Sequence, residues 1–143
     1  MSLEQIYQAI PHRPPFLLVD EILEQGENHI VCAKQLTGEE FWFAGHYPGQ
    51  PLMPGVLLCE AAMQAGAILL SKFVEEPLEK KVPVATRLND VRFKQMVRPG
   101  DRFELHVELR ERLANAFFLN AKVTVGGKLA VRLEFACTLA PAS

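Results

Sequence analysis

The sequence has few cysteines and no paired cysteine motif. Cys32, Cys59 and Cys137 are the three cysteines among 143 residues, and no two of them form a CxxC pair. An odd number without short spacing is unlike a disulfide scaffold or a zinc site, and it suits a reduced protein. Each lies in an apolar run, so we expect all three to be small core residues. The N-terminal residues also lack the pattern of a signal peptide, so a cytoplasmic location is expected.

The sequence also has no large excess of positive or negative charge. Lys and Arg total 15 against 17 Asp and Glu, a net charge of -2. This balance argues against non-specific nucleic-acid binding, which needs a cationic surface. Hydrophobic residues make up 49% and charged residues 22%, which excludes a disordered chain. The length and the absence of repeats or linkers predict a single domain over residues 1–143.

Alternating and continuous apolar segments predict one sheet and one long helix. Apolar or alternating runs bounded by turn residues predict strands over 16–23, 29–36, 82–97, 103–110, 117–125 and 129–139. One continuous apolar run predicts a helix over 56–70. Gly126-Gly127 is a hairpin signal between the last two strands. Consecutive hairpin-like strands favour an antiparallel sheet, and the helix needs cover on several sides. The expected architecture is α+β, with a curved antiparallel sheet wrapped around a central buried helix.

The predicted helix over 56–70 is apolar on nearly every side. Glu60 and Gln64 are its polar residues. A helix of this kind is buried, and its fifteen residues reach about 22 Å, short of a hydrocarbon core of ~30 Å. We therefore expect a core helix and no membrane association.

Glu60 and Gln64 are candidates for a functional role because they lie in that apolar helix. A carboxylate there is costly unless it is paired, hydrogen-bonded or protonated, and a protonated one can act as a general acid. Gln64 is four residues on and faces the same way, so we expect it to contribute to substrate binding. The alternative is that both side chains satisfy backbone groups or buried water.

His46 lies in a long loop between the second strand and the helix. Gly45, Pro48 and Gly49 surround it and restrict the loop, so its imidazole is a candidate general base. A packed or solvated role is the commoner one for a loop histidine, and it is the expected one for His12, His29 and His106. None of the four has HxxxH or HxH spacing, so no metal site is expected.

Two further features complete the candidate site. Gly55 and Val56 open the helix, and their N–H groups lie at the positive end of its dipole, where a developing oxyanion could be stabilised. Every helix has such an end, so this signal is weak alone. Basic residues cluster around a predicted turn at 99–101, either as a solvated face or as a docking patch for an acidic partner. They are Arg92, Lys94, Arg98 and Arg102.

Four segments resemble the (3R)-hydroxyacyl-[acyl-carrier-protein] dehydratases of bacterial type II fatty acid synthesis. They are PHRPPFLLVD at 11–20, GHYPGQPLMPGVL at 45–57, EAAMQA at 60–65, and RFK at 92–94 followed by Val97 and PGD at 99–101. The segments occur in order and the resemblance spans about residues 10–138. It implies the hot-dog fold, which the pattern of elements also indicates, and an obligate dimer that often forms a trimer of dimers.

The same resemblance implies a reaction and roles for particular residues. The reaction is dehydration of a 3-hydroxyacyl chain on acyl carrier protein to the trans-2-enoyl form, without a cofactor. The family's histidine and acidic residue correspond to His46 and Glu60, contributed by different subunits, and the glycine that binds the thioester carbonyl corresponds to Gly55. Acyl carrier protein would dock near Lys94, Arg98 and Arg102. Glutamate rather than aspartate at position 60 resembles the dehydratase-only branch of the family more than its bifunctional dehydratase/isomerase branch.

Two alternatives share the fold and remain open from the residues alone. An acyl-thioesterase would need a water activated by Glu60, and the loop histidine followed by the Met53-Pro54-Gly55 helix start argues against it. A non-catalytic acyl-binding subunit would be expected to lack His46 or Glu60, and this chain has both.

Overall fold

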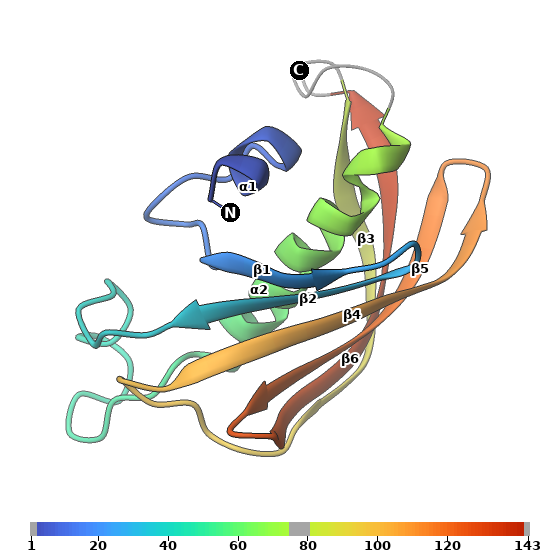
Figure 1. The fold of residues 1–143 in the computed structure, drawn as a ribbon. Coiled ribbons are helices and arrows are strands. Elements are labelled where there is room, and N and C mark those ends of the chain that lie inside the picture. Colours follow the sequence, from blue (N-terminus) through green and yellow to red (C-terminus); the bar gives the residue numbers. More distant parts are fainter. Residues whose placement is uncertain (1–2, 75–80, 142–143) are drawn as a thin grey trace.

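One long helix lies in the bend of a six-stranded antiparallel sheet (Figure 1). The computed structural model describes residues 3–74 and 81–141. The helical elements are α1 (Leu3–Ala9), α2 (Gly55–Leu70) and the short 3-10 turn η1 (Ser71–Phe73). The strands are β1 (Glu21–Gln25), β2 (His29–Gln35), β3 (Lys81–Phe93), β4 (Arg102–Leu113), β5 (Ala116–Val125) and β6 (Lys128–Pro141).

The strands are arranged in the order β1-β2-β4-β5-β6-β3, and every neighbouring pair is antiparallel. The turn between β5 and β6 is the predicted one, because Gly126 and Gly127 both have positive φ, at 58° and 81°. Strand β3 follows the helix in the chain but lies at the far edge of the sheet, beside β6. The α+β hot-dog architecture expected from the sequence is confirmed.

Some element boundaries differ from the prediction. Residues 16–20 are not part of a strand, because their backbone is hydrogen-bonded to the Gln64 side chain instead. The Leu18 N–H donates to this side chain, and the Phe16 carbonyl accepts from it. Strand β3 ends at Phe93 rather than at residue 97, since Val97 leaves the sheet and its carbonyl accepts from Met53 N at 2.7 Å.

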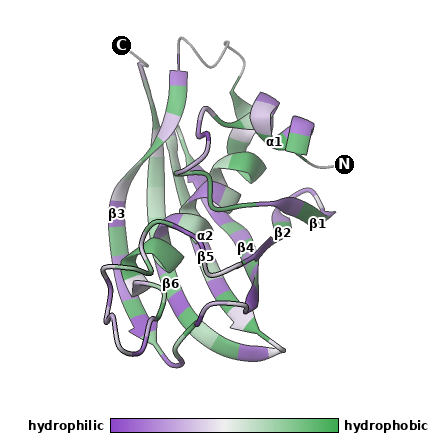
Figure 2. Ribbon diagram, turned by 90° about the vertical axis from the view of Figure 1, so that its left-hand side faces the viewer, coloured by the Kyte–Doolittle hydropathy of each residue, from purple (hydrophilic) through white to green (hydrophobic). Residues whose placement is uncertain are grey.

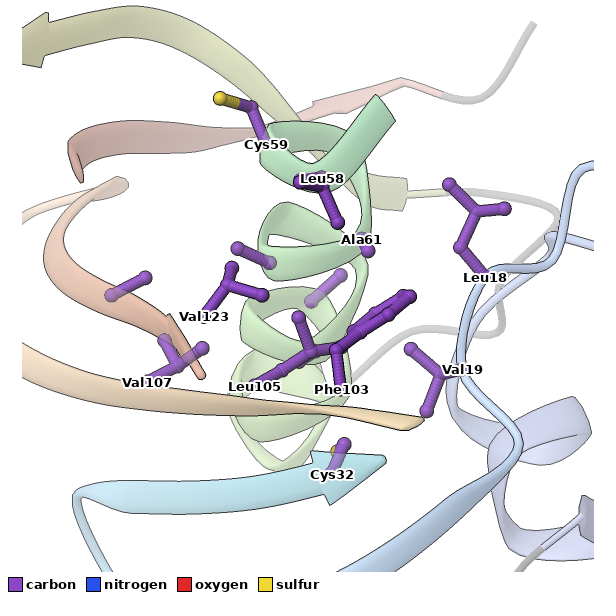
Figure 3. Packing of buried hydrophobic residues seen from close by; sticks show 14 of the residues in the cluster. Leu18, Val19, Cys32, Leu58, Cys59, Ala61, Phe103, Leu105, Val107 and Val123 are labelled. Atoms are coloured by element: carbon purple, nitrogen blue, oxygen red, sulfur yellow. The ribbon is translucent and has the colours of Figure 1, made fainter. Parts of the chain in front are cut away.

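Helix α2 supplies the centre of the hydrophobic core, and strand residues such as Phe103, Leu105 and Val107 lie against it (Figure 3). Hydrophobic and hydrophilic residues follow one another along the strands (Figure 2). Ala61, Ala62 and Ala65 are completely buried. A Cβ atom on Gly66 would lie 2.8 Å from Phe135 Cζ, so the absence of a side chain lets helix and sheet approach closely. The small residues of α2 therefore set the distance between the two layers.

The helical run Gly55–Phe73 has the length and composition of a membrane span. Most of it is enclosed by the protein, however: 61% of its most apolar window is buried. A helix that is mostly covered by its own sheet is typical of the core of a globular protein. This is the core helix that the sequence predicts.

All three cysteines are core residues, as expected. Cys32, Cys59 and Cys137 are buried and free. Burial raises the pKa of the Cys32 thiol to about 12 and that of Cys137 to about 11, and it also raises the pKa of Cys59. The thiols therefore stay protonated near neutral pH and are poor nucleophiles.

Candidate active site

His46 lies in an open groove at the start of helix α2. The groove has a volume of about 560 Å³ and is bounded by the loop around His46, the first turn of α2 and the segment after β3. The His46 Nδ1 atom lies 2.8 Å from the Leu52 carbonyl oxygen. A carbonyl oxygen can only accept, so Nδ1 carries the proton and Nε2 has a free lone pair. This is the tautomer that a general base needs.

The residue after His46 holds the loop in a tight conformation. Tyr47 has a φ of 58°, in the left-handed region that side chains rarely adopt. Its ring meets the His46 imidazole edge-on, with 4.8 Å between the ring centroids. The hydrogen bond to Leu52 and this ring contact together restrict the orientation of the imidazole.

Gly55 and Val56 line the same groove and begin the helix. The residue before them is Pro54, which provides no side-chain cap, and the residues that the structure describes supply no acceptor for the Gly55 and Val56 N–H groups. A Cβ atom on Gly55 would lie 2.5 Å from Phe93 Cε1, so any larger residue here would displace the Phe93 ring. Two backbone donors at a helix N-terminus thus lie beside the histidine, as the sequence predicts.

Glu60 does not line the groove of its own chain. It lies five residues after Gly55, which places it about 140° around the helix and about 7.5 Å further along the axis. Its side chain is 25% exposed, and its Oε2 atom lies 3.0 Å from Gln64 Nε2 and 3.7 Å from His12 Nε2. Within one chain the structure therefore does not bring Glu60 and His46 into one site.

Gln64 is fully engaged with protein groups and is 1% exposed. Leu18 N donates to its Oε1 at 2.7 Å, and its Nε2 donates to the Phe16 carbonyl at 2.9 Å and to Glu60. Both amide hydrogens are used. The expectation that a polar pair faces the same side of the helix is confirmed, but the amide of Gln64 faces residues 16–18 and the carboxylate rather than the groove.

The basic cluster divides into paired and unpaired members. Arg102 Nη2 lies 2.8 Å from Glu21 Oε1, and Arg92 Nε lies 3.0 Å from Asp90 Oδ1. Lys94 lines the groove, and Arg98 lies beside the Met96 sulfur at 3.5 Å. Within residues 3–74 and 81–141 neither of these two cations has a carboxylate partner.

Two residues near these groups were given no role by the sequence. His12, assigned to the packed or solvated histidines, lies against Glu60. Phe93, the last residue of β3, lies against Gly55 and is 55% exposed. The signal for His12 was present in the segment at 11–20, but nothing in a linear sequence shows that this segment meets the middle of α2.

The fold and the site define a hot-dog-fold protein with groups for acid–base chemistry at the start of its central helix. A family model described as a FabA-like domain matches residues 10–134. The chain therefore belongs to the FabA-like 3-hydroxyacyl-[acyl-carrier-protein] dehydratase family, as its resemblance indicated.

Relatives from several bacteria support this assignment. The chain is 43% identical over 130 residues to the 3-hydroxyacyl-[acyl-carrier-protein] dehydratase FabZ of Clostridium perfringens, covering 91% of this chain and 92% of that protein. It is 41% identical over 131 residues to the protein of the same name from Nitratidesulfovibrio vulgaris, covering 91% and 85%.

Solved structures with much lower identity share the fold. The dehydratase heterocomplex ApeI:P from Xenorhabdus doucetiae superposes with a TM-score of 0.79 at 14% identity, covering 94% of this chain and 90% of that one. The thioesterase HI1161 from Haemophilus influenzae has a TM-score of 0.64 at 16% identity, covering 85% and 78%. At such identities the similarity concerns the fold alone.

Proposed function

We propose that this protein dehydrates a 3-hydroxyacyl chain on acyl carrier protein to the trans-2-enoyl form. The observation that carries the proposal is the groove lined by both His46 and Gly55, in which the Leu52 carbonyl fixes the proton of His46 on Nδ1. The curated relatives at 41–43% identity bear the name of this activity. No redox change or group transfer is involved, so the reaction needs no cofactor.

His46, Gly55 and Glu60 have one role each in the reaction. His46 Nε2 takes a proton from C2 of the substrate, which the thioester makes acidic. The Gly55 N–H, with Val56 N–H beside it, stabilises the negative charge that develops on the thioester oxygen. Glu60 gives a proton to the C3 hydroxyl, which leaves as water while the C2–C3 double bond forms.

The site is completed by a second copy of the chain. Glu60 does not line the groove of its own chain, so a carboxylate from elsewhere must reach it. Strand β3 is a long edge strand with exposed apolar side chains, among them Val84 at 39% and Leu88 at 46%. Such an edge is a site of strand pairing between molecules. A homodimer is the smallest assembly that places Glu60 of one subunit near His46 of the other, and a trimer of dimers is the larger one implied by the family.

Gln64 acts on Glu60 rather than on the substrate. Its amide hydrogens are already used by Phe16 and Glu60, so they are not available for a thioester. This revises the substrate-binding role expected from the sequence. The bond to Oε2 leaves the other carboxylate oxygen, Oε1, for the leaving hydroxyl.

The carrier protein approaches over the basic residues beside the groove. Lys94 and Arg98 are exposed and unpaired in the described chain, whereas Arg102 is partly neutralised by Glu21. An acidic carrier is attracted to such a surface. A cytoplasmic location is part of the proposal and is supported by the three free, buried thiols.

The alternatives are weaker on the same observations. A thioesterase would hydrolyse the thioester with a water held by Glu60, but the groove next to the helix start holds a histidine with a free Nε2 instead. A non-catalytic subunit would not require that tautomer or a carboxylate oriented by Gln64.

The test uses two inactive variants, followed by the absorbance of the enoyl thioester. His46→Ala and Glu60→Gln should each lower turnover by about a hundredfold or more, the scale of a lost general acid or base. Mixing them after subunit exchange should restore about a quarter of wild-type activity, because half the dimers are then mixed and each has one intact site of two. No recovery after demonstrated exchange would contradict the shared site.

A further inference from the structure

We propose that His12 is a positioning residue for the dehydration: its neutral Nε2–H holds Glu60 through Oε2 and directs Oε1 to the substrate. The inference rests on the role proposed above for Glu60. It concerns a residue that follows α1 and that belongs to neither the histidine loop nor the core helix.

The contact geometry places two nitrogen atoms around one oxygen atom of Glu60. His12 Nε2 lies 3.7 Å and Gln64 Nε2 lies 3.0 Å from Glu60 Oε2. The His12 ring stacks on Phe16, with 6.5 Å between centroids and 19° between planes, and the Phe16 carbonyl is itself bound by Gln64. The residues that the structure describes provide no hydrogen bond to Oε1. A movement of under about 1 Å brings His12 into hydrogen-bond range, and such bonds tighten when substrate binds.

The environment of the second ring nitrogen selects the tautomer. His12 Nδ1 is buried and has no hydrogen-bond partner in the structure. A proton on Nδ1 would create an unsatisfied buried donor and would turn the Nε2 lone pair toward the carboxylate, two unfavourable interactions at once. A proton on Nε2 instead points at Glu60 Oε2. The neutral Nε2–H form is therefore the stable one.

The charge state follows from the groups that face the ring. Burial lowers the pKa of His12 below its ordinary value of 6.5, the Glu60 carboxylate opposes this, and the Arg13 guanidinium adds to it. His12 is therefore neutral near pH 7. A neutral donor suits a general acid: it orients the carboxyl and stabilises the carboxylate left after proton transfer. A fixed positive charge in its place would favour the ionised form before the reaction begins.

Two substitutions separate a hydrogen-bond donor from a packing group. His12→Phe keeps an aromatic ring on Phe16 but loses the donor, and it should lower kcat by about 10–100-fold with KM changed by less than about threefold, as for other groups that orient a reactive one. His12→Gln keeps an N–H donor that does not titrate, and should retain activity within about threefold. The high-pH limb of the rate profile should move to higher pH in His12→Phe only, since the carboxylate form has lost a donor.

The matched control is His106→Phe, because His106 also lies beside a carboxylate, 3.1 Å from Glu104 Oε1, on β4. It should leave the rate and the profile unchanged. Equal losses in His12→Phe and His12→Gln with an unchanged profile would show that the ring only packs, and would overturn the proposal. A wild-type rate in His12→Phe would also overturn it.

A measurement without turnover separates this inference from the proposed function. Nitrogen-15 NMR of the imidazole in the His46→Ala variant should show the Nε2–H tautomer of His12 above pH 7. In Glu60→Gln, His12 should titrate at a lower pH than with Glu60 present, because the carboxylate raises its pKa. An Nδ1–H tautomer, or a titration indifferent to Glu60, would overturn the role of His12 even where His46 and Glu60 prove essential.

Discussion

Gln64 Nε2 donates a hydrogen bond to Glu60 Oε2 at 3.0 Å, one turn apart on helix α2. The same amide also holds Phe16 and Leu18 through their backbone groups. The carboxylate, the core helix and the segment before β1 therefore form one hydrogen-bonded unit. The orientation of the proposed acid depends on a part of the chain more than forty residues away in sequence.

Replacing Gln64 by Leu should destabilise the protein by about 2–5 kcal/mol. The variant leaves the Leu18 N–H and the Phe16 carbonyl without their partner, and each buried unsatisfied group costs about 1–3 kcal/mol. Urea unfolding of both proteins measures the difference. Gln8→Leu is the matched control, because Gln8 is exposed on α1 and its replacement should change the free energy of unfolding by less than about 0.5 kcal/mol. Equal stabilities of wild type and Gln64→Leu would contradict the network.

Gly55→Ala should reduce turnover by about tenfold or more while the protein stays folded. The new Cβ would meet the Phe93 ring, which is more than half exposed and can turn aside into the groove. A misplacement of about 1 Å in a site can cost about a hundredfold in rate. The double variant Gly55→Ala with Phe93→Ala should recover activity relative to Gly55→Ala alone. Equal activity of the single and double variants would exclude the Phe93 contact as the cause.

Arg98→Glu should raise KM for the carrier-bound substrate, most at low salt. Rim charges act mainly on encounter and on its salt dependence. Turnover of a short thioester without the carrier should change little, since His46 and Gly55 are untouched. Arg110→Glu, an exposed arginine toward the other end of β4, is the control and should leave both substrates unaffected. Equal losses of Arg98→Glu on the two substrates would point to damaged folding instead of lost docking.

The stability of the protein should fall as the pH decreases below about 6.5, in part because of His12. Its pKa is lowered from 6.5 in the folded state, so the unfolded chain binds a proton first and gains free energy from it. The contribution of the neutral His12 to the free energy of unfolding is complete above pH 6.5 and decreases below it. Thermal unfolding between pH 7.5 and pH 5.5 should show a smaller decrease for His12→Gln than for wild type. Parallel curves would mean that His12 titrates equally in both states.

Much of the fold was predictable because local patterns and core burial agree. The alternation of β4 and β6 predicts one buried face, and Phe103, Leu105, Leu133 and Phe135 are buried as that pattern requires. The apolar run after Gly55 predicts the core helix almost to the residue. Residues 16–20 were wrongly predicted as strand. An apolar run has the same sequence pattern whether its backbone is hydrogen-bonded to a neighbouring strand or, as here, to the Gln64 side chain.

The sequence by itself determined which chemical groups the protein carries. His46 in a loop rich in proline and glycine, the backbone N–H of Gly55, and Glu60 in an apolar helix were all identifiable in the linear order. What the tertiary structure decided is the pairing of these groups. The Leu52 carbonyl sets the tautomer of His46, the helical rotation turns Glu60 away from the groove of its own chain, and His12 and Gln64 meet its Oε2 atom. These contacts join residues far apart in sequence, and the geometry that joins them exists only once the sheet has closed around α2.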